Sequence, residues 1–204
     1  MLSKNLPEVG MVTEADLMQI LKESQAFLAG HFRLSSGLHS GNYLQCAQVF
    51  RFPEHSETLS RLLVEKIRQA GIGFDQVISP ALGGILFGYE VSRQAGVPNI
   101  FAEREPDNKM ALRRGFAIQP GESFLVVEDV VTTGGSSLEV MRLVREAGGR
   151  VAAHGCVADR SRGKLTLDVP FFSLVTLDFP AYEPESCPLC AQGLPVVKPG
   201  SKKV

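Results

Sequence analysis

Short, continuous apolar segments recur along this chain, and their spacing constrains its fold more than any other feature. Their starts lie roughly 25 residues apart, which is the length of one strand plus one helix that returns to the same edge. The segments are Gln76–Ser79, Asn99–Ala102, Phe124–Val127, Val151–Val157 and Phe171–Val175. Helical stretches fit between several of them, notably Gly84–Gln94 and Ser136–Ala147. Buried strands that alternate with helices predict an α/β fold, a central mostly parallel sheet flanked by helices.

The rest of the chain adds elements around this sheet. Amphipathic helices are expected at Thr13–Leu28 and Pro53–Ala70, and Phe32–Tyr43 predicts a short strand and a loop that turns at Ser36-Gly37. Residues 180–204 contain five prolines and predict an extended tail. The 204 residues are expected to form a single domain, residues 1–204.

Composition excludes several classes of protein. The net charge is −1, from 21 basic and 22 acidic residues, so no overall field favours nucleic acid or an anionic membrane. No apolar run approaches the roughly 20 residues of a membrane span. The N-terminus lacks the apolar core of a signal peptide, and the four cysteines give no sign of export. We therefore expect a cytoplasmic protein with reduced thiols, which binds neither nucleic acid nor membrane.

The stretch FLVVEDVVTTGGSS, residues 124–137, has the features of a phosphate site. Gly134 and Gly135 lack a Cβ, so the loop can expose several backbone N–H groups to an anion. Ser136 and Glu139 have the spacing of a capping box, which predicts a helix start whose N-terminus faces the same anion. The loop matches neither GxxxxGK nor GxGxxG. An ordinary turn at the end of a strand is the alternative interpretation.

The paired acids Glu128 and Asp129 need a partner other than the phosphate, which they would repel. They suit hydrogen bonds from sugar hydroxyls, or a divalent cation that the ligand brings. A sugar phosphate with vicinal hydroxyls satisfies both halves of the motif.

The same stretch closely resembles the phosphoribosyl-pyrophosphate (PRPP) motif of type I phosphoribosyltransferases. The rest of the chain is similar to the orotate phosphoribosyltransferases, in particular their Thermus-like branch. The resemblance implies the type I phosphoribosyltransferase fold, with a small N-terminal hood from about residues 1–45 over the base site. It implies transfer of 5-phosphoribosyl from PRPP to orotate, giving orotidine 5-monophosphate and pyrophosphate in pyrimidine biosynthesis. A purine or xanthine phosphoribosyltransferase and a non-catalytic PRPP- or nucleotide-sensing regulator are the rival hypotheses.

The resemblance also assigns residues to PRPP. Glu128 and Asp129 would bind the ribose hydroxyls, and the loop that follows would hold the 5-phosphate. SPALGG, residues 79–84, would contact pyrophosphate through its backbone, because the lysine often found near Gly83 is missing. The implied PRPP contacts are Ala81, Gly83, Arg104, Lys109, Glu128, Asp129, Val130, Val131, Thr132, Thr133, Gly134, Gly135 and Ser136.

Other segments supply the base site and the catalytic charges. HFRLSSGLHSGNY implies orotate contacts from Ser36 and Gly37, and VADRSRG implies one from Arg160 to the orotate carboxylate. Thr132 of the PRPP motif is a further implied orotate contact. Many members carry a lysine where His39 stands, so that role is not transferred. The polar segment Glu103–Gly115 resembles the mobile catalytic loop, which reaches the neighbouring subunit and so implies a homodimer. Lys109, Arg104 and Asp129 are the implied catalytic residues.

Two further predictions concern metals. The resemblance implies Mg²⁺ that is held mainly through PRPP, with no direct protein ligand. Separately, Cys187 and Cys190 in CPLC have metal-type spacing, but zinc needs two more ligands. His154, Cys46 and Cys156 are candidates only if the fold brings them close. We therefore favour a plain turn in the tail.

Overall fold

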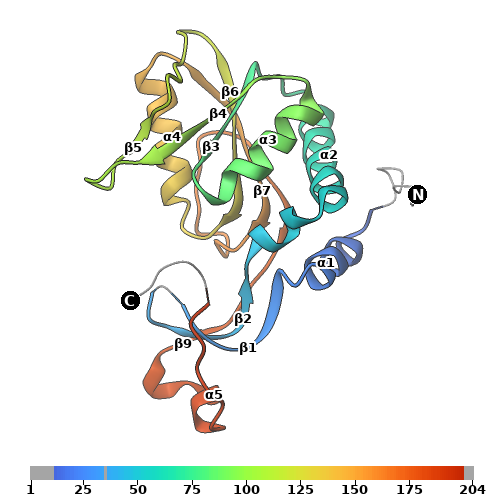
Figure 1. Ribbon diagram of the computed structural model, residues 1–204, viewed down its shortest axis with the longest axis vertical. Coiled ribbons are helices and arrows are strands. Elements are labelled where there is room, and N and C mark those ends of the chain that lie inside the picture. Colours follow the sequence, from blue (N-terminus) through green and yellow to red (C-terminus); the bar gives the residue numbers. More distant parts are fainter. Residues whose placement is uncertain (1–11, 35, 200–204) are drawn as a thin grey trace.

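The computed structural model describes residues 12–34 and 36–199, and its centre is a six-stranded sheet (Figure 1). The strand order is β5-β4-β3-β6-β7-β8, and every pair is parallel except β4 with β5. The strands are β3 Gln76–Pro80, β4 Asn99–Arg104, β5 Met110–Leu112, β6 Ser123–Val131, β7 Arg150–Asp159 and β8 Phe171–Thr176. The predicted α/β fold with a mostly parallel sheet is confirmed.

Alternate residues of the central strands pack against helices on opposite faces of the sheet. Leu125 and Val127 of β6 belong to one core with the helices α2 (Pro53–Gln69) and α3 (Gly83–Ala95). Phe124 and Val126 belong to a second core with α4 (Gly135–Glu146). Figure 1 shows α4 on one side of β6, and α2 and α3 on the other. This two-sided burial explains why the strand sequences are continuously apolar.

A smaller, three-stranded sheet forms the hood. Its order is β1-β2-β9, all antiparallel, with β1 Phe27–Arg33, β2 His39–Leu44 and β9 Ala181–Tyr182. The 3₁₀ helix η2, Cys46–Arg51, leads from β2 to α2. Helix α1, Glu14–Glu23, begins at a capping box between Thr13 and Asp16, and it ends earlier than predicted because the chain enters β1. No helix among the described residues is long and apolar enough to cross a membrane.

The tail differs from the extended segment that its prolines predict. Its start supplies β9 to the hood, where it pairs with β2. It then forms the 3₁₀ helix η3, Pro184–Ser186, and the single-turn helix α5, Pro188–Ala191. Val197 next pairs with β1: its N–H donates to the carbonyl of His31, and its own carbonyl accepts from the N–H of Arg33.

His154 of β7 is fully buried, and neither ring nitrogen has a hydrogen-bond partner. Its ring stacks on Phe171, with centroids 5.0 Å apart. Burial disfavours the charged form and lowers the pKa of His154 to about 4. The unfolded chain therefore binds the extra proton first as the pH falls.

This burial predicts an acid-sensitive contribution to stability. Above the unfolded pKa of about 6.5, His154 is neutral in both states and makes no pH-dependent contribution to the free energy of unfolding. Between that pH and about pH 4 only the unfolded chain binds the proton, so the free energy of unfolding should fall by up to about 3 kcal/mol. His154→Phe should lose that part of the pH dependence in urea titrations. His55→Phe, which changes a partly exposed histidine of α2, serves as the control. Identical pH profiles for wild type and His154→Phe would contradict the argument.

Candidate active site

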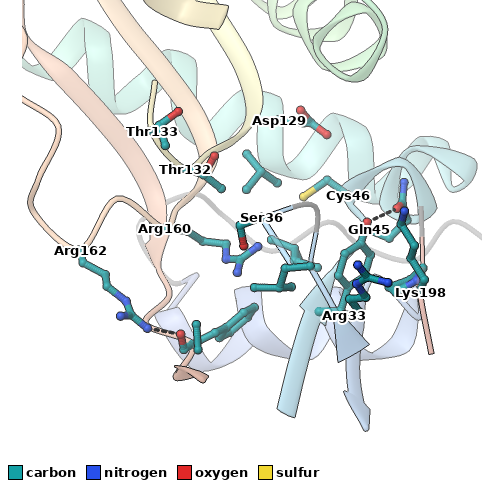
Figure 2. Close-up of a pocket in the computed structure, with 17 residues that line it drawn as sticks. Arg33, Ser36, Gln45, Cys46, Asp129, Thr132, Thr133, Arg160, Arg162 and Lys198 are labelled. Atoms are coloured by element: carbon teal, nitrogen blue, oxygen red, sulfur yellow. Dashed lines mark hydrogen bonds between the residues drawn. The ribbon is translucent and has the colours of Figure 1, made fainter. Parts of the chain in front are cut away.

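A pocket of about 590 Å³ lies where the hood meets the carboxyl ends of β6 and β7. Figure 2 shows its labelled side chains, with Asp129, Thr132 and Thr133 above Arg160 and Ser36. In open α/β sheets, ligands bind outside the carboxyl ends of strands, so the position itself suggests a binding site. The lining residues used below are Arg33, Ser36, Tyr43, Cys46, Asp129, Val130, Thr132, Thr133, Arg160 and Lys198.

The pairing of β6 with β7 brings the two predicted halves of the site together. Val130 lies opposite Ala158, and Val131 lies opposite Asp159. The ladder continues one step further, because the N–H of Arg160 donates to the carbonyl of Val131 at 2.8 Å. Arg160 therefore leaves the sheet at the same level as Thr132.

Glu128 and Asp129 are consecutive residues near the carboxyl end of β6, so their side chains point to opposite faces of the sheet. Glu128 accepts a hydrogen bond from the hydroxyl of Ser137 on α4. Asp129 instead lies beside Gly83 at the start of α3. Burial raises the pKa of Glu128 to about 7 and raises the pKa of Asp129 as well. The sheet thus separates the side chains of two consecutive acidic residues, and both carboxyl groups are shielded from bulk water.

The hydroxyl-glycine loop after β6 has the backbone that an anion site needs. Gly134 has φ +75°, and a Cβ there would lie 2.6 Å from Leu165 Cδ1. Helix α4 begins at the next residue, so its free N–H groups open toward the loop. The predicted capping box of Ser136 and Glu139 is wrong: Gly134 is the N-cap and contributes no side chain.

Gly83 and its neighbours approach the acids closely. The Ala81–Leu82 peptide is cis. A Cβ at Gly83 would lie 2.7 Å from Asp129 Oδ1, and one at Gly84 would lie 3.1 Å from the Val127 carbonyl oxygen. The glycines of SPALGG therefore let α3 begin directly against β6.

The Arg160 side chain lies over an aromatic ring at the pocket wall. Its guanidinium carbon lies 4.5 Å from the centroid of Phe179, and it shares the pocket wall with Tyr43 and Cys46. Burial lowers the pKa of Arg160, which nevertheless stays a cation at any ordinary pH. The neighbouring Asp159 accepts a hydrogen bond from the N–H of Ser161 at 2.7 Å.

The hood contributes both predicted and unpredicted residues. Ser36 lines the pocket, whereas Gly37 has φ +91° and serves the hairpin turn. His39 is buried and hydrogen-bonds to His31. Arg33 and Tyr43 also line the pocket, and they were missed because nothing in their local sequence marks them as pocket residues. Lys198 was missed because the tail reaches the pocket only through its pairing with β1.

The predicted catalytic residues Arg104 and Lys109 do not line this pocket. They belong to the hairpin of β4 and β5, at the edge of the sheet, and two strands separate β5 from β6. Arg104 pairs with both carboxylate oxygens of Glu139 on α4, at 2.9 and 3.1 Å. Lys109 pairs with Asp107 at 2.9 Å. Arg114, a further cation of this segment, pairs with Glu103 at 2.8 Å.

The structure does not bring the predicted metal ligands His154, Cys46 and Cys156 to Cys187 and Cys190. Cys46 lines the pocket, and His154 and Cys156 are buried on β7. His31 and His39 lie beside Cys187 and Cys190 instead.

The fold and the site together define a phosphoribosyltransferase: a parallel sheet, two acids at a strand end, and a glycine-containing anion loop that opens a helix. Residues 47–184 match the family described as "Phosphoribosyl transferase domain".

Curated relatives show which phosphoribosyltransferases the chain is most similar to in sequence. The chain is 55% identical over 188 residues to orotate phosphoribosyltransferase of Caldanaerobacter subterraneus subsp. tengcongensis, covering 92% of this chain and 97% of the relative. It is 48% identical to the enzyme of that name from Thermotoga petrophila, covering 91% and 98%. Among solved structures, Aeropyrum pernix orotate phosphoribosyltransferase superposes with TM-score 0.69 and 26% identity, covering 79% of this chain and 93% of that one. The chain belongs to the orotate phosphoribosyltransferase family.

The contact between Gly83 and Asp129 predicts a binding defect. In Gly83→Ala the new methyl group must displace the carboxylate, so we expect the KM for PRPP to rise roughly tenfold, equivalent to about 1.4 kcal/mol. Steady-state kinetics with varied PRPP measure this. The control is Gly73→Ala, where a Cβ meets nothing within 4 Å. A folded Gly83→Ala protein with unchanged KM for PRPP would refute the assignment of Asp129 to that ligand.

Proposed function

We propose that this protein transfers the 5-phosphoribosyl group from PRPP to orotate, forming orotidine 5-monophosphate and pyrophosphate in the de novo pyrimidine pathway. The observation that carries the proposal is the shared pocket of Asp129, Thr132 and Arg160. An acid for sugar hydroxyls, a loop for phosphate and a buried guanidinium for a planar carboxylate match the three parts of the product.

In the reaction the bond between ribose C1 and the diphosphate oxygen breaks, and its electron pair leaves with pyrophosphate. A ring nitrogen of orotate supplies the electron pair of the new bond to C1. That nitrogen is acidic enough to lose its proton in solution, so no general base is assigned. The protein's part is to hold both substrates in line and to keep water away from an electron-poor ribose.

Each half of the pocket performs one of these tasks. Asp129, which lines the pocket, and Glu128, which would turn from Ser137 to reach it, accept hydrogen bonds from the ribose hydroxyls, and the N–H groups from Thr132 to Ser136 hold the 5-phosphate. Arg160 pairs with the orotate carboxylate, while the turn at Ser36 closes over the base. Because Arg160 is buried against Phe179, its attraction for that carboxylate is screened less than at the surface.

Mg²⁺ fits this site as a partner of PRPP. Carboxylate and phosphate oxygens are the ligands that it prefers, and Asp129 lines the pocket beside the proposed ribose position. When bound, it neutralises charge on the diphosphate. Burial raises the pKa of Glu128 to about 7, so this carboxyl is increasingly ionised above neutral pH.

A homodimer would bring the missing cations to the pocket. Arg104 and Lys109 are paired within their own chain and do not line its pocket. The start of α3 also exposes Leu82, Leu86 and Tyr89, at 82%, 55% and 61% of their surfaces, which suits a contact with a second copy. We propose that the hairpin closes over the neighbouring subunit's pocket and that its cations stabilise the departing pyrophosphate. A cytoplasmic location stays a prediction.

A substrate panel tests the proposed reaction. With PRPP and Mg²⁺, the wild-type protein should consume orotate and should not convert purines. The decrease in orotate absorbance measures the reaction. Arg160→Ala should raise the KM for orotate roughly 10- to 100-fold, because a charge-assisted pair is worth about 1.5–3 kcal/mol. Arg142→Ala, on the exposed face of α4, is the matched control. PRPP-dependent conversion of a purine would overturn the substrate, and PRPP binding without any turnover would favour the regulator.

Hybrid dimers test the shared hairpin. Lys109→Ala should lower kcat far more than it weakens PRPP binding, since its charge matters most as pyrophosphate leaves. A purified hybrid of one Lys109→Ala chain and one Asp129→Asn chain should regain about half of the wild-type activity, because one of its two sites is intact. If the hairpin acts within its own chain, both sites are defective and no activity returns.

A further inference from the structure

Four potential metal ligands meet where the tail contacts the hood, and none of them lines the pocket. His31 lies on β1 and His39 on β2, whereas Cys187 is the N-cap of α5 and Cys190 lies within this helix. One ligand atom from each residue lies within 4.8 Å of the other three. We propose that these residues form a tetrahedral zinc site that fastens the C-terminal tail to the hood.

The distances suit zinc. Zinc–sulfur bonds of about 2.3 Å and zinc–nitrogen bonds of about 2.0–2.1 Å place two nitrogens about 3.3 Å apart in a tetrahedron, and a nitrogen and a sulfur about 3.6 Å apart. His31 Nε2 and His39 Nδ1 are 2.9 Å apart. Cys187 Sγ lies 3.5 Å from His31 Nε2, and Cys190 Sγ lies 3.3 Å from His39 Nδ1 and 3.8 Å from His31 Nε2.

The tautomer of His31 is set by a neighbour outside the cluster. Its Nδ1 lies 2.8 Å from the carbonyl oxygen of Leu194. A carbonyl only accepts, so Nδ1 carries the proton and Nε2 presents its lone pair to the centre of the cluster. A backbone carbonyl that fixes a histidine in this way is the usual support of a zinc ligand.

Charge and burial agree with a structural site. Two thiolates, two neutral imidazoles and Zn²⁺ sum to zero, so the centre suits a place where His31, His39 and Cys187 are only 4%, 7% and 3% exposed. Cys190 is exposed and offers an entry path. Four protein ligands leave no open position, which is the mark of a structural rather than a catalytic zinc.

The tail has little else to hold it. Within residues 183–199, all of them described, Cys187 is the only buried residue. Helix α5 has four residues, too few to be stable alone. Leu194, Val196 and Val197 remain 43%, 44% and 52% exposed. A metal bond would therefore supply the anchor that the tail lacks in apolar contacts, and would keep Lys198 at the rim of the pocket.

Metal analysis of the full chain tests this site, and its result does not depend on which base the enzyme uses as substrate. Protein purified under reducing conditions should hold about one zinc per chain, the stoichiometry of a four-ligand site. Replacing zinc with Co²⁺ should give the visible bands of tetrahedral cobalt and near-ultraviolet sulfur-to-cobalt charge transfer. Cys190→Ser and His39→Gln should bind zinc more weakly in competition with a chromophoric chelator. Cys156→Ala and His55→Gln, which lie outside the cluster, should bind it as wild type does.

Chelation gives a second readout that does not depend on any variant folding. Removing the metal from wild type should lower the midpoint of thermal unfolding and expose the chain after Tyr182 to protease, and added Zn²⁺ should reverse both. A folded wild type that binds neither Zn²⁺ nor Co²⁺, a disulfide between Cys187 and Cys190, or full zinc retention in the cluster variants would each overturn the proposal.

Discussion

The parallel pairing of β6 with β7 is the interaction on which the rest of this structure depends. It ends two strands at one edge of the sheet, and the bond from the N–H of Arg160 to the carbonyl of Val131 extends the ladder beyond the last regular pair. A guanidinium and a phosphate-type loop, about 30 residues apart in sequence, thereby become neighbours, as a right-handed crossover through α4 allows. A change in this register would move Arg160 away from the loop and divide the pocket that they line together.

The pleat of β6 explains how two adjacent carboxylates can share a strand end. Glu128 turns to Ser137 on one face, and Asp129 turns to Gly83 on the other. The helices that cover the two faces thus give the two acids different surroundings. Helix α4 supplies a hydroxyl donor to Glu128, and the start of α3 places a glycine without a side chain beside Asp129. Their burial disfavours the charged carboxylates and so raises both pKa values.

The sequence predicts the sheet well because its signals are local. Continuous apolar runs and the acids before the glycine loop each describe one element and its immediate exit. It fails where a distant partner competes: Glu139 has capping-box spacing, yet Arg104 holds its carboxylate from another element. His31, His39 and Lys198 were missed for the same reason. Their roles arise only when residues more than 140 positions apart pair at the hood.

The hood and its tail therefore complete a pocket that the sheet begins. A crystal structure with orotidine 5-monophosphate would test this account most directly. It predicts the phosphate on the N–H groups from Thr132 to Ser136, the ribose hydroxyls at Glu128 and Asp129, and the carboxylate on Arg160. A product bound with its carboxylate away from Arg160, or its phosphate away from that loop, would contradict it.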